Sequence, residues 1–221
     1  MNIIKIKKSL TATILLVTLA LFLLTGCIGD SSNNGDSGED FTFVDLQGNE
    51  QHLSDYRGKV VVVDLMGINC PPCAVQMFEI EQIYSSYSSE DVAIISIDVW
   101  SSFGETAQDL NDLKSAFSCV SPCDKENKYL NLNLKELKEA YNKQNGIDLD
   151  WTFGLDDNEG SIFYEYVGVG GGVPTICIFD QKGNLHLKHS GLSVFSDIPY
   201  FLSSLSPPPQ KLAPEINELL E

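Results

Sequence analysis

Basic residues are scarce in this chain of 221 residues. It has 14 Lys and Arg against 31 Asp and Glu, which gives a formal net charge of −17. The first 26 residues hold three Lys and no acid, so the remaining 195 carry 11 − 31 = −20 charges. Phosphate groups would be repelled by such a surface, and we therefore expect no nucleic-acid partner.

Metal-ligating side chains are also few. Of the three His, His52 stands alone, and on a strand His186 and His189 would point to opposite faces because they are an odd number of positions apart. The six Cys are too few for a disulfide-dense miniprotein and too unevenly placed for a zinc ribbon, which needs two close pairs. We expect no metal site and no cofactor.

Long apolar runs are confined to the N-terminus, where residues 10–24 follow a short basic stretch. This is typical of an export signal and is short for a membrane-spanning helix. The run ends in Leu-Thr-Gly-Cys at 24–27, which resembles the lipobox of prokaryotic lipoproteins. We expect lipidation at Cys27; the alternative is an uncleaved N-terminal anchor. Either way the body is expected at the extracytoplasmic face of the cell membrane, where disulfides are permitted.

Composition divides the rest of the chain. Residues 27–40 are almost all Gly, Ser, Asn and Asp, which predicts a flexible tether after the signal peptide at 1–26. An apolar fraction of 43% supports a packed core, and we expect one domain at 41–206 with an insertion at about 101–150. Residues 207–221 are expected to form a Pro-rich and short helical tail.

The body alternates strand and helix patterns. Residues 59–66 and 91–100 contain apolar runs with β-branched residues, typical of buried strands. Pro71 and Pro72 open a helix to about residue 88, since prolines are tolerated in its first turn. Ser102 and Glu105 have the spacing of a capping box, which predicts a helix start there. Other expected elements are a hairpin at 41–53, strands at 151–155, 173–179 and 185–189, and helices near 133–141, 158–166, 193–205 and 213–221. We expect an α/β fold with a mixed central sheet.

The motif Cys-Pro-Pro-Cys at 70–73 carries the chemistry. It lies between a predicted buried strand and a helix start, where unpaired N–H groups and the helix dipole favour a thiolate. Cys70 is predicted to be the exposed nucleophile, and Cys73, on the apolar face of the helix, the buried resolving thiol. The alternatives are half of a zinc site or an inert structural disulfide. At a strand-to-helix junction of an exported chain, the redox interpretation is favoured.

From about residue 41 to 205 the chain resembles the thioredoxin-like proteins of the TlpA/ResA type, which are membrane-tethered thiol–disulfide oxidoreductases. The matching segments are LSDYRGK at 53–59, CPPC at 70–73, VPT at 173–175 and FDQKGN at 179–184. The resemblance implies a thioredoxin-like sheet and a cis Val173–Pro174 bond that faces the Cys70–Cys73 disulfide and contacts substrate. Without the resemblance, an ordinary turn proline is favoured at Pro174, because only about 5–6% of X–Pro bonds in folded proteins are cis. The chain departs from the family at Asn69, Gln76 and Phe78, where Trp, Glu and Pro are common.

Three further positions are candidates for a role. Asp64, six residues before Cys70, is either a core acid or the proton carrier for Cys73, because burial raises a carboxyl pKa. Trp100 ends a strand parallel to the Cys70 strand, and is either a substrate contact at that sheet edge or a core residue. Cys177 is expected to be an inert core thiol.

Cys119 and Cys123 are close enough in sequence for a disulfide. We expect a structural disulfide that fixes the insertion. A second redox couple, metal ligands and free thiols are the alternatives.

The sequence therefore predicts an enzyme, a thiol–disulfide oxidoreductase that exchanges its Cys70–Cys73 disulfide with protein substrates, acting as a reductant by analogy with the family. Expected partners are thiol- or disulfide-bearing exported proteins and a membrane electron donor. One alternative is a thioredoxin-fold binding module or copper chaperone without turnover. Another is a peroxiredoxin-like peroxidase, which Gly67 disfavours because such enzymes carry Thr or Ser three residues before the reactive Cys.

Overall fold

The computed structural model describes residues 38–118, 138–143, 146–199, 202, 204–205 and 208–221. They belong to one compact unit, Asp36–Glu221. The predicted signal peptide, the lipidation site Cys27 and the predicted disulfide between Cys119 and Cys123 lie outside the described residues. No helix in the described part of the chain is both long enough and apolar enough to cross a membrane.

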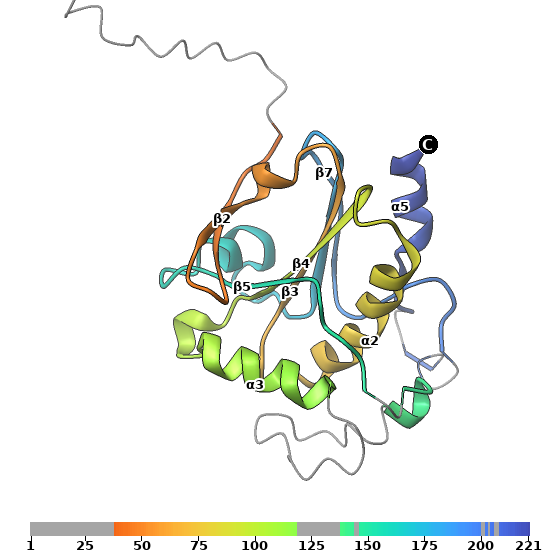
Figure 1. Cartoon of the computed structure of the whole chain (residues 1–221), viewed down its shortest axis with the longest axis horizontal. Coiled ribbons are helices and arrows are strands. Elements are labelled where there is room, and N and C mark those ends of the chain that lie inside the picture. Colours follow the sequence, from red (N-terminus) through yellow and green to blue (C-terminus); the bar gives the residue numbers. More distant parts are fainter. Residues whose placement is uncertain (1–37, 119–137, 144–145, 200–201, 203, 206–207) are drawn as a thin grey trace, which may run out of the picture. The chain divides into compact units, whose positions relative to one another are not determined.

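A seven-stranded mixed sheet forms the centre of the described unit (Figure 1), with the strand order β2-β1-β5-β4-β3-β6-β7. Strands β3, β4 and β5 are parallel, while β1, β6 and β7 run antiparallel to their neighbours. The strands are β1 (Thr42–Asp45), β2 (Glu50–His52), β3 (Val60–Met66), β4 (Val92–Asp98), β5 (Thr152–Leu155), β6 (Thr175–Phe179) and β7 (Leu185–Ser190). The predicted α/β class with a mixed sheet and a leading hairpin is confirmed.

The central strand β3 is buried along its whole length, as its sequence predicts. All seven residues from Val60 to Met66 are buried, because each face of the sheet is covered by its own cluster of hydrophobic side chains. Branched side chains such as those of Val60–Val63 suit a strand packed on both faces. The single polar member of β3 is Asp64, which is fully buried.

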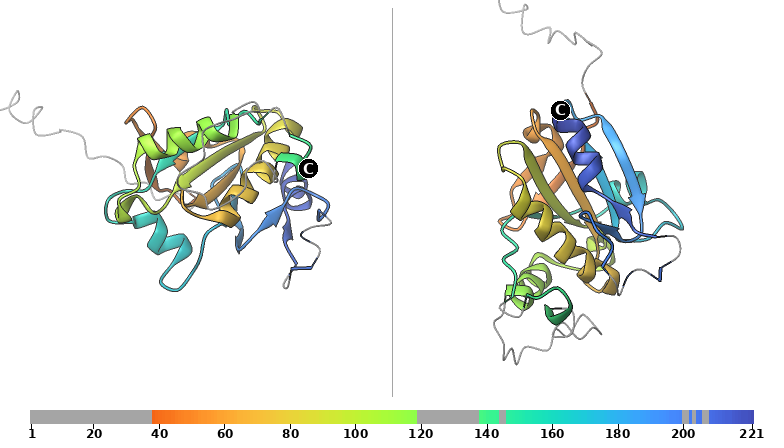
Figure 2. Two further views of the ribbon diagram at one scale, coloured as in Figure 1. Left: turned by 90° about the horizontal axis from the view of Figure 1, so that it is seen from below. Right: turned by 90° about the vertical axis from the view of Figure 1, so that its right-hand side faces the viewer.

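Helices cover the sheet unequally (Figure 2). On one face, α2 (Pro71–Ser86), α3 (Ala107–Ser118) and α5 (Ala213–Leu220) share a hydrophobic cluster with the sheet. The other face packs against the π-helical turn η3 (Phe163–Val167) and residues of the leading hairpin. Two 3-10 turns, η1 (Leu53–Tyr56) and η2 (Ser101–Phe103), complete the described elements before β5.

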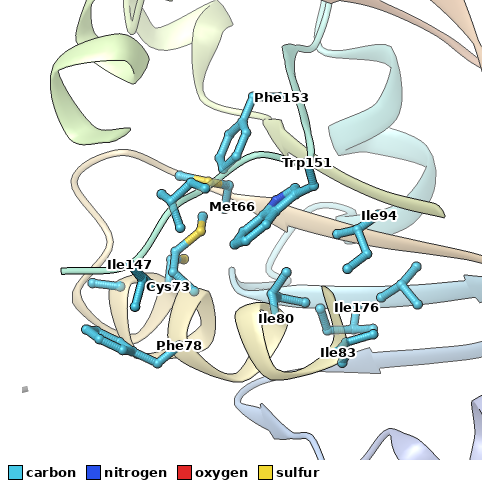
Figure 3. Close-up of a cluster of buried hydrophobic side chains, with 14 of the residues drawn as sticks. Met66, Cys73, Phe78, Ile80, Ile83, Ile94, Ile147, Trp151, Phe153 and Ile176 are labelled. Atoms are coloured by element: carbon cyan, nitrogen blue, oxygen red, sulfur yellow. The ribbon is translucent and has the colours of Figure 1, made fainter. Parts of the chain in front are cut away.

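The cluster beneath α2 includes both motif cysteines, Cys70 and Cys73. Figure 3 shows Cys73 pointing from α2 toward Met66 of β3 and the ring of Trp151. Trp151 stacks on Phe153 with ring centroids 5.4 Å apart. Cys73 therefore belongs to the apolar core, as its place on the helix predicts.

The predicted helix at 193–205 is wrong at its start. Ser193 and Val194 form a short strand, β8, which pairs in parallel with β9 (Gln210–Lys211). The reason is a contact distant in sequence: the backbone N–H of Ser193 donates to the Gln76 side chain at 2.8 Å. The segment after β9 packs on the core, with the N-cap residue Leu212 and Ile216 of α5 (Ala213–Leu220) fully buried.

Sheet topology brings three loops together at one edge. The parallel register pairs Met66 with Asp98, so the segments after β3 and β4 leave the sheet side by side. Antiparallel β6 begins at Thr175, opposite Leu65, so the loop before β6 reaches the same edge. These three loops carry the CPPC motif, Trp100 and Pro174.

Candidate active site

The sulfur of Cys70 caps the N-terminus of α2. Cys70 is the N-cap residue, and the backbone N–H of Cys73 donates to its Sγ at 3.2 Å. Pro71 and Pro72 occupy the first two helical positions and have no N–H. The N–H of Cys73 is therefore the first in α2 that a Cys70 thiolate can use, in addition to the positive end of the helix dipole.

The two cysteines form a disulfide that is largely covered. Cys70 and Cys73 are bonded, with their Cα atoms 5.2 Å apart. Cys73 is 1% exposed, as expected, but Cys70 is also only 3% exposed. The prediction of an exposed Cys70 is thus wrong for this disulfide form. The cause is the loop before β6, since the Val173 carbonyl oxygen lies 3.6 Å from Cys70 Sγ.

The Val173–Pro174 peptide bond is cis, as the resemblance predicts. The loop is fixed behind the proline, where the Thr175 hydroxyl donates to the Gly172 carbonyl at 2.7 Å and lies 2.9 Å from the Ser190 hydroxyl. Pro174 therefore lies between Val173, whose carbonyl oxygen is next to Cys70 Sγ, and strand β6, which begins at Thr175. The loop before β6 therefore lies directly over the Cys70 sulfur.

Asp64 lies on the face of β3 that α2 covers, as do Val62 and Met66 of the same strand. It is fully buried, and one carboxyl oxygen accepts a hydrogen bond of 3.2 Å from Ser96. The other oxygen has no hydrogen-bond partner among the described residues. Burial raises the pKa of Asp64 to about 7, and the bond from Ser96 opposes this rise. A carboxyl with this pKa can exchange a proton near neutral pH.

Glu105 holds the segment in front of Cys70, a role that the sequence did not reveal. Its carboxylate accepts the backbone N–H groups of Ile68 at 2.8 Å and Asn69 at 3.2 Å, and the Asn69 side-chain amide at 2.7 Å. The predicted capping box from Ser102 to Glu105 is therefore wrong. Thr106 and Asp109 cap α3 instead, with the Asp109 N–H donating to Thr106 Oγ1 at 3.3 Å and the Thr106 N–H to the Asp109 carboxylate at 3.1 Å.

Trp100 lies against the motif loop. A Cβ atom placed on Gly67 would be 2.3 Å from the nearest atom of the Trp100 ring. Trp100 is half-buried and packs against both hydrophobic clusters at the predicted sheet edge. Its ring fills the space where a side chain at position 67 would lie.

This contact predicts a large effect of a small substitution. We expect Gly67→Ala to lower the free energy of unfolding by about 1–3 kcal/mol, because the rigid indole must move to admit the methyl group. Gly172→Ala is the matched control, since a Cβ there meets no atom within 4 Å. Chemical denaturation of both variants measures the difference. Equal stabilities would contradict the close packing of Trp100 on Gly67.

Other candidates lie apart from the motif. Cys177 is 1% exposed, and burial raises its thiol pKa to about 12, in keeping with an inert core thiol. His186 faces Glu215 of α5 at 3.2 Å. The departures from the family have structural roles: Gln76 binds Ser193, and Phe78 stacks on Tyr141 with ring centroids 4.7 Å apart.

Comparisons with known proteins show which proteins this chain is similar to. A profile described as the AhpC/TSA family matches residues 34–188. The thiol-disulfide oxidoreductase ResA of Geobacillus kaustophilus is 26% identical over 175 residues, which cover 78% of each chain. ResA of Geobacillus thermodenitrificans is 31% identical over 99 residues, 44% of this chain and 55% of that protein. Among solved structures, a thiol:disulfide interchange protein of Chlorobium tepidum covers 84% of this chain and 96% of its own, at 15% identity and a TM-score of 0.45.

Proposed function

Because this chain belongs to the AhpC/TSA family, we propose that its Cys70–Cys73 pair exchanges electrons with exported proteins at the outer face of a membrane, as a reductant. The chain is a thioredoxin-like thiol–disulfide oxidoreductase, as its relatives named ResA are. The proposal concerns the direction of electron transfer, the cellular location of the protein and its attachment to the membrane. The observation that carries it is the Cys70 sulfur at the N-terminus of α2, with the Cys73 N–H donating to it.

The reaction proceeds in two exchange steps. The Cys70 thiolate attacks one sulfur of a substrate disulfide, a Cys70–substrate bond forms, and the second substrate sulfur leaves as a thiolate. Cys73 then loses its proton and attacks Cys70 Sγ, which releases the first substrate sulfur. The substrate gains two electrons and two protons, and the Cys70–Cys73 disulfide remains. A membrane-bound dithiol donor reduces that disulfide for the next cycle.

The local chemistry supports the reducing direction. When the reduced dithiol form of such a protein is stabilised, its disulfide form is a strong oxidant. The reduced form is stabilised by N–H donors and positive charge near the reactive thiolate. Here Pro71 and Pro72 remove two N–H groups from the helix terminus, and the neighbouring loop carries the carboxylate of Glu105. Both features disfavour the thiolate and hence the reduced form. The expected potential is nearer to that of thioredoxin, about −270 mV, than to that of DsbA, about −120 mV.

Location and tether rest on the N-terminal sequence. Residues 10–24 followed by Cys27 are typical of an exported lipoprotein, and the acidic tether at 27–40 supplies reach. Mass spectrometry of the mature protein tests the lipid at Cys27. An unmodified chain that retains residues 1–26 would favour the uncleaved anchor.

A peroxidase function is disfavoured by the packing at Gly67. The Trp100 ring occupies the space that a Thr or Ser side chain at this position would need. Catalysed reduction of insulin disulfides, measured on the same sample as copper binding and peroxide turnover, tests the proposed function against its alternatives. Insulin reduction that depends on Cys70 supports the oxidoreductase; copper binding without reduction would support a binding module.

One substitution tests why the pair is reducing. We expect Pro72→Ala to raise the reduction potential by about 30 mV, equivalent to about 1.4 kcal/mol, because the new N–H at the second helical position stabilises the Cys70 thiolate. Pro71→Ala is the control, since the first helical N–H is not the usual partner of an N-cap side chain. Equilibration with glutathione buffers measures both. Equal potentials for both variants and wild type would refute the argument from missing donors.

A further inference from the structure

A hollow of about 510 Å³ opens beside the motif loop. It is bordered by the residue that precedes Cys70, by the segment after β4 and by the first turn of α3. The lining residues are Asn69, Trp100, Phe103, Gly104, Glu105 and Asp109. Because consecutive Cα atoms are about 3.8 Å apart, a group bound over Asn69 lies next to Cys70 along the chain. The hollow is thus in place to receive a residue of the polypeptide that reacts with Cys70.

The charge of the hollow has one sign. Glu105 and Asp109 contribute carboxylates, and no Lys, Arg or His is present among the described lining residues. Asp98, fully buried at the end of β4, adds a third carboxyl behind them. Burial raises the pKa of Asp98 to about 8, and the charges of Glu105 and Asp109 raise it further in the same direction. Asp98 therefore keeps its proton near pH 7, and a cation that enters the hollow is attracted by the carboxylates of Glu105 and Asp109.

The walls of the hollow are aromatic. Phe103 is 70% exposed, and Trp100 borders the same space. Phe103 also meets Phe163 edge-on with ring centroids 6.2 Å apart, and the neighbouring Tyr164 is 60% exposed. Large exposed rings of this kind are typical of binding surfaces. Aromatic faces next to carboxylates suit an ammonium or guanidinium group, which gains from both.

The carboxylates act here as fixed charges. Glu105 already accepts three hydrogen bonds from Ile68 and Asn69, and Asp109 accepts the Thr106 backbone N–H at 3.1 Å. These bonds hold both groups in place and leave their oxygens poorly placed to surround a small metal ion. A long cationic side chain, which stacks on Trp100 or Phe103 and approaches the carboxylates end-on, fits the arrangement better.

We propose that this hollow binds an arginine or lysine side chain of the polypeptide whose disulfide Cys70 attacks. The substrates are then exported proteins with a basic residue close to the reacting cysteine. This inference rests on the proposed function and narrows its substrate class. The bound cation also orients the substrate, since it fixes one residue beside Asn69 while the Val173 carbonyl oxygen lies 3.6 Å from Cys70 Sγ.

The test uses the purified full-length protein, pre-reduced, and three peptides that share one intramolecular disulfide. The residue beside the reactive cysteine is arginine, its neutral analogue citrulline, or glutamate. The rate constant for oxidation of the protein is measured with each peptide. We expect arginine to exceed glutamate at least about tenfold at 0.01 M ionic strength, equivalent to about 1.4 kcal/mol, and the ratio to fall at about 1 M salt, where the Debye length is about 3 Å.

Two variants separate the hollow from the overall negative charge. Asp109→Asn and Glu159→Gln each remove one charge, and Glu159 is exposed and absent from the hollow. We expect Asp109→Asn to lower the arginine-to-glutamate ratio at least about threefold, a local Coulomb effect, and Glu159→Gln to preserve it. Phe103→Ala should lower the arginine-to-citrulline ratio, because it removes an aromatic face.

Equal rates for the three peptides, a higher rate for citrulline than for arginine, or equal losses in Asp109→Asn and Glu159→Gln would overturn the inference. The small neutral hydroxyethyl disulfide distinguishes this failure from that of the proposed function. Wild-type protein that reacts with hydroxyethyl disulfide but does not discriminate among the peptides refutes the basic-residue site alone. Wild-type protein that reacts with no disulfide refutes the oxidoreductase assignment as well.

Discussion

Cys73→Ser is expected to accumulate a mixed disulfide between Cys70 and its substrate, while Cys70→Ser is expected to lose turnover by at least about a thousandfold, the scale on which removal of a nucleophile acts. The asymmetry follows from the structure. Cys70 Sγ receives the N–H of Cys73 at the helix terminus, whereas the Cys73 side chain points into the apolar core. A thiolate at Cys70 is therefore stabilised, and a thiolate at Cys73 is not.

The intermediate is identified by non-reducing electrophoresis and by mass spectrometry of the linked peptides. Cys177→Ser is the matched control, because Cys177 is buried and free, with a raised thiol pKa. It should leave turnover within about twofold of wild type, as a core substitution away from the reacting atoms. A trapped substrate on Cys73 in Cys70→Ser, or faster alkylation of Cys73 than of Cys70 in the reduced protein, would contradict the assignment.

Asp64→Asn is expected to slow the second step, attack by Cys73, by about a hundredfold or more, the usual effect of losing a general base. Attack by Cys70 should change little. Asp64 accepts a proton only when it is ionised, and its pKa is raised to about 7. The rate of the second step in wild type should therefore rise with pH and level off above pH 7. This dependence should disappear in Asp64→Asn.

Ser96→Ala provides a graded check of the same claim. The Ser96 hydroxyl donates to Asp64 at 3.2 Å and opposes the rise in its pKa. Without this bond, the pH midpoint of the second step should move above 7. Rapid-quench separation of the mixed disulfide from the final products measures each step. Equal effects of Asp64→Asn on both steps, or no effect, would leave Asp64 as a core acid alone.

The same carboxyl makes stability depend on pH. The pKa of Asp64 is about 7 in the folded protein, against an ordinary value of 3.8 for an Asp side chain. As pH rises, Asp64 therefore loses its proton at a lower pH in the unfolded chain than in the folded protein. The contribution of protonated Asp64 to stability is complete below about pH 4. It decreases as pH rises and is lost at about pH 7. At about 1.36 kcal/mol for each pKa unit, the loss is about 4 kcal/mol. Asp64→Asn should remove this part of the pH dependence of unfolding.

Local patterns were enough to predict the centre of the fold. The Val-rich run of β3 and the apolar run of β4 are typical of strands buried on both faces of a sheet. The paired prolines after Cys70 indicate the start of a helix. The Cys70–Cys73 pair and the cis Val173–Pro174 bond were likewise expected, and register explains their meeting, since Leu65 lies opposite Thr175. Residue roles at these positions stay predictions until variants are measured.

What the sequence did not reveal depends on contacts between distant residues. Glu105 matched a helix cap in spacing, but its carboxylate instead binds Ile68 and Asn69, 37 and 36 residues earlier. The local sequence predicts a helix at Ser193, because nothing near it in the chain indicates that the Gln76 side chain binds its backbone. An acid at the end of a strand, such as Asp98, is a weak signal by itself. Its raised pKa depends in part on Glu105, which folding places beside it.

The most direct test of the oxidoreductase assignment is a single-turnover reaction. Fully reduced protein is mixed with an excess of a disulfide-bonded protein substrate, quenched in acid, and alkylated for mass spectrometry of both partners. We expect one substrate disulfide to be reduced for each Cys70–Cys73 disulfide formed, with Cys177 alkylated only after unfolding. An unreduced substrate, or oxidation of other cysteines while Cys70 and Cys73 remain alkylated, would contradict it.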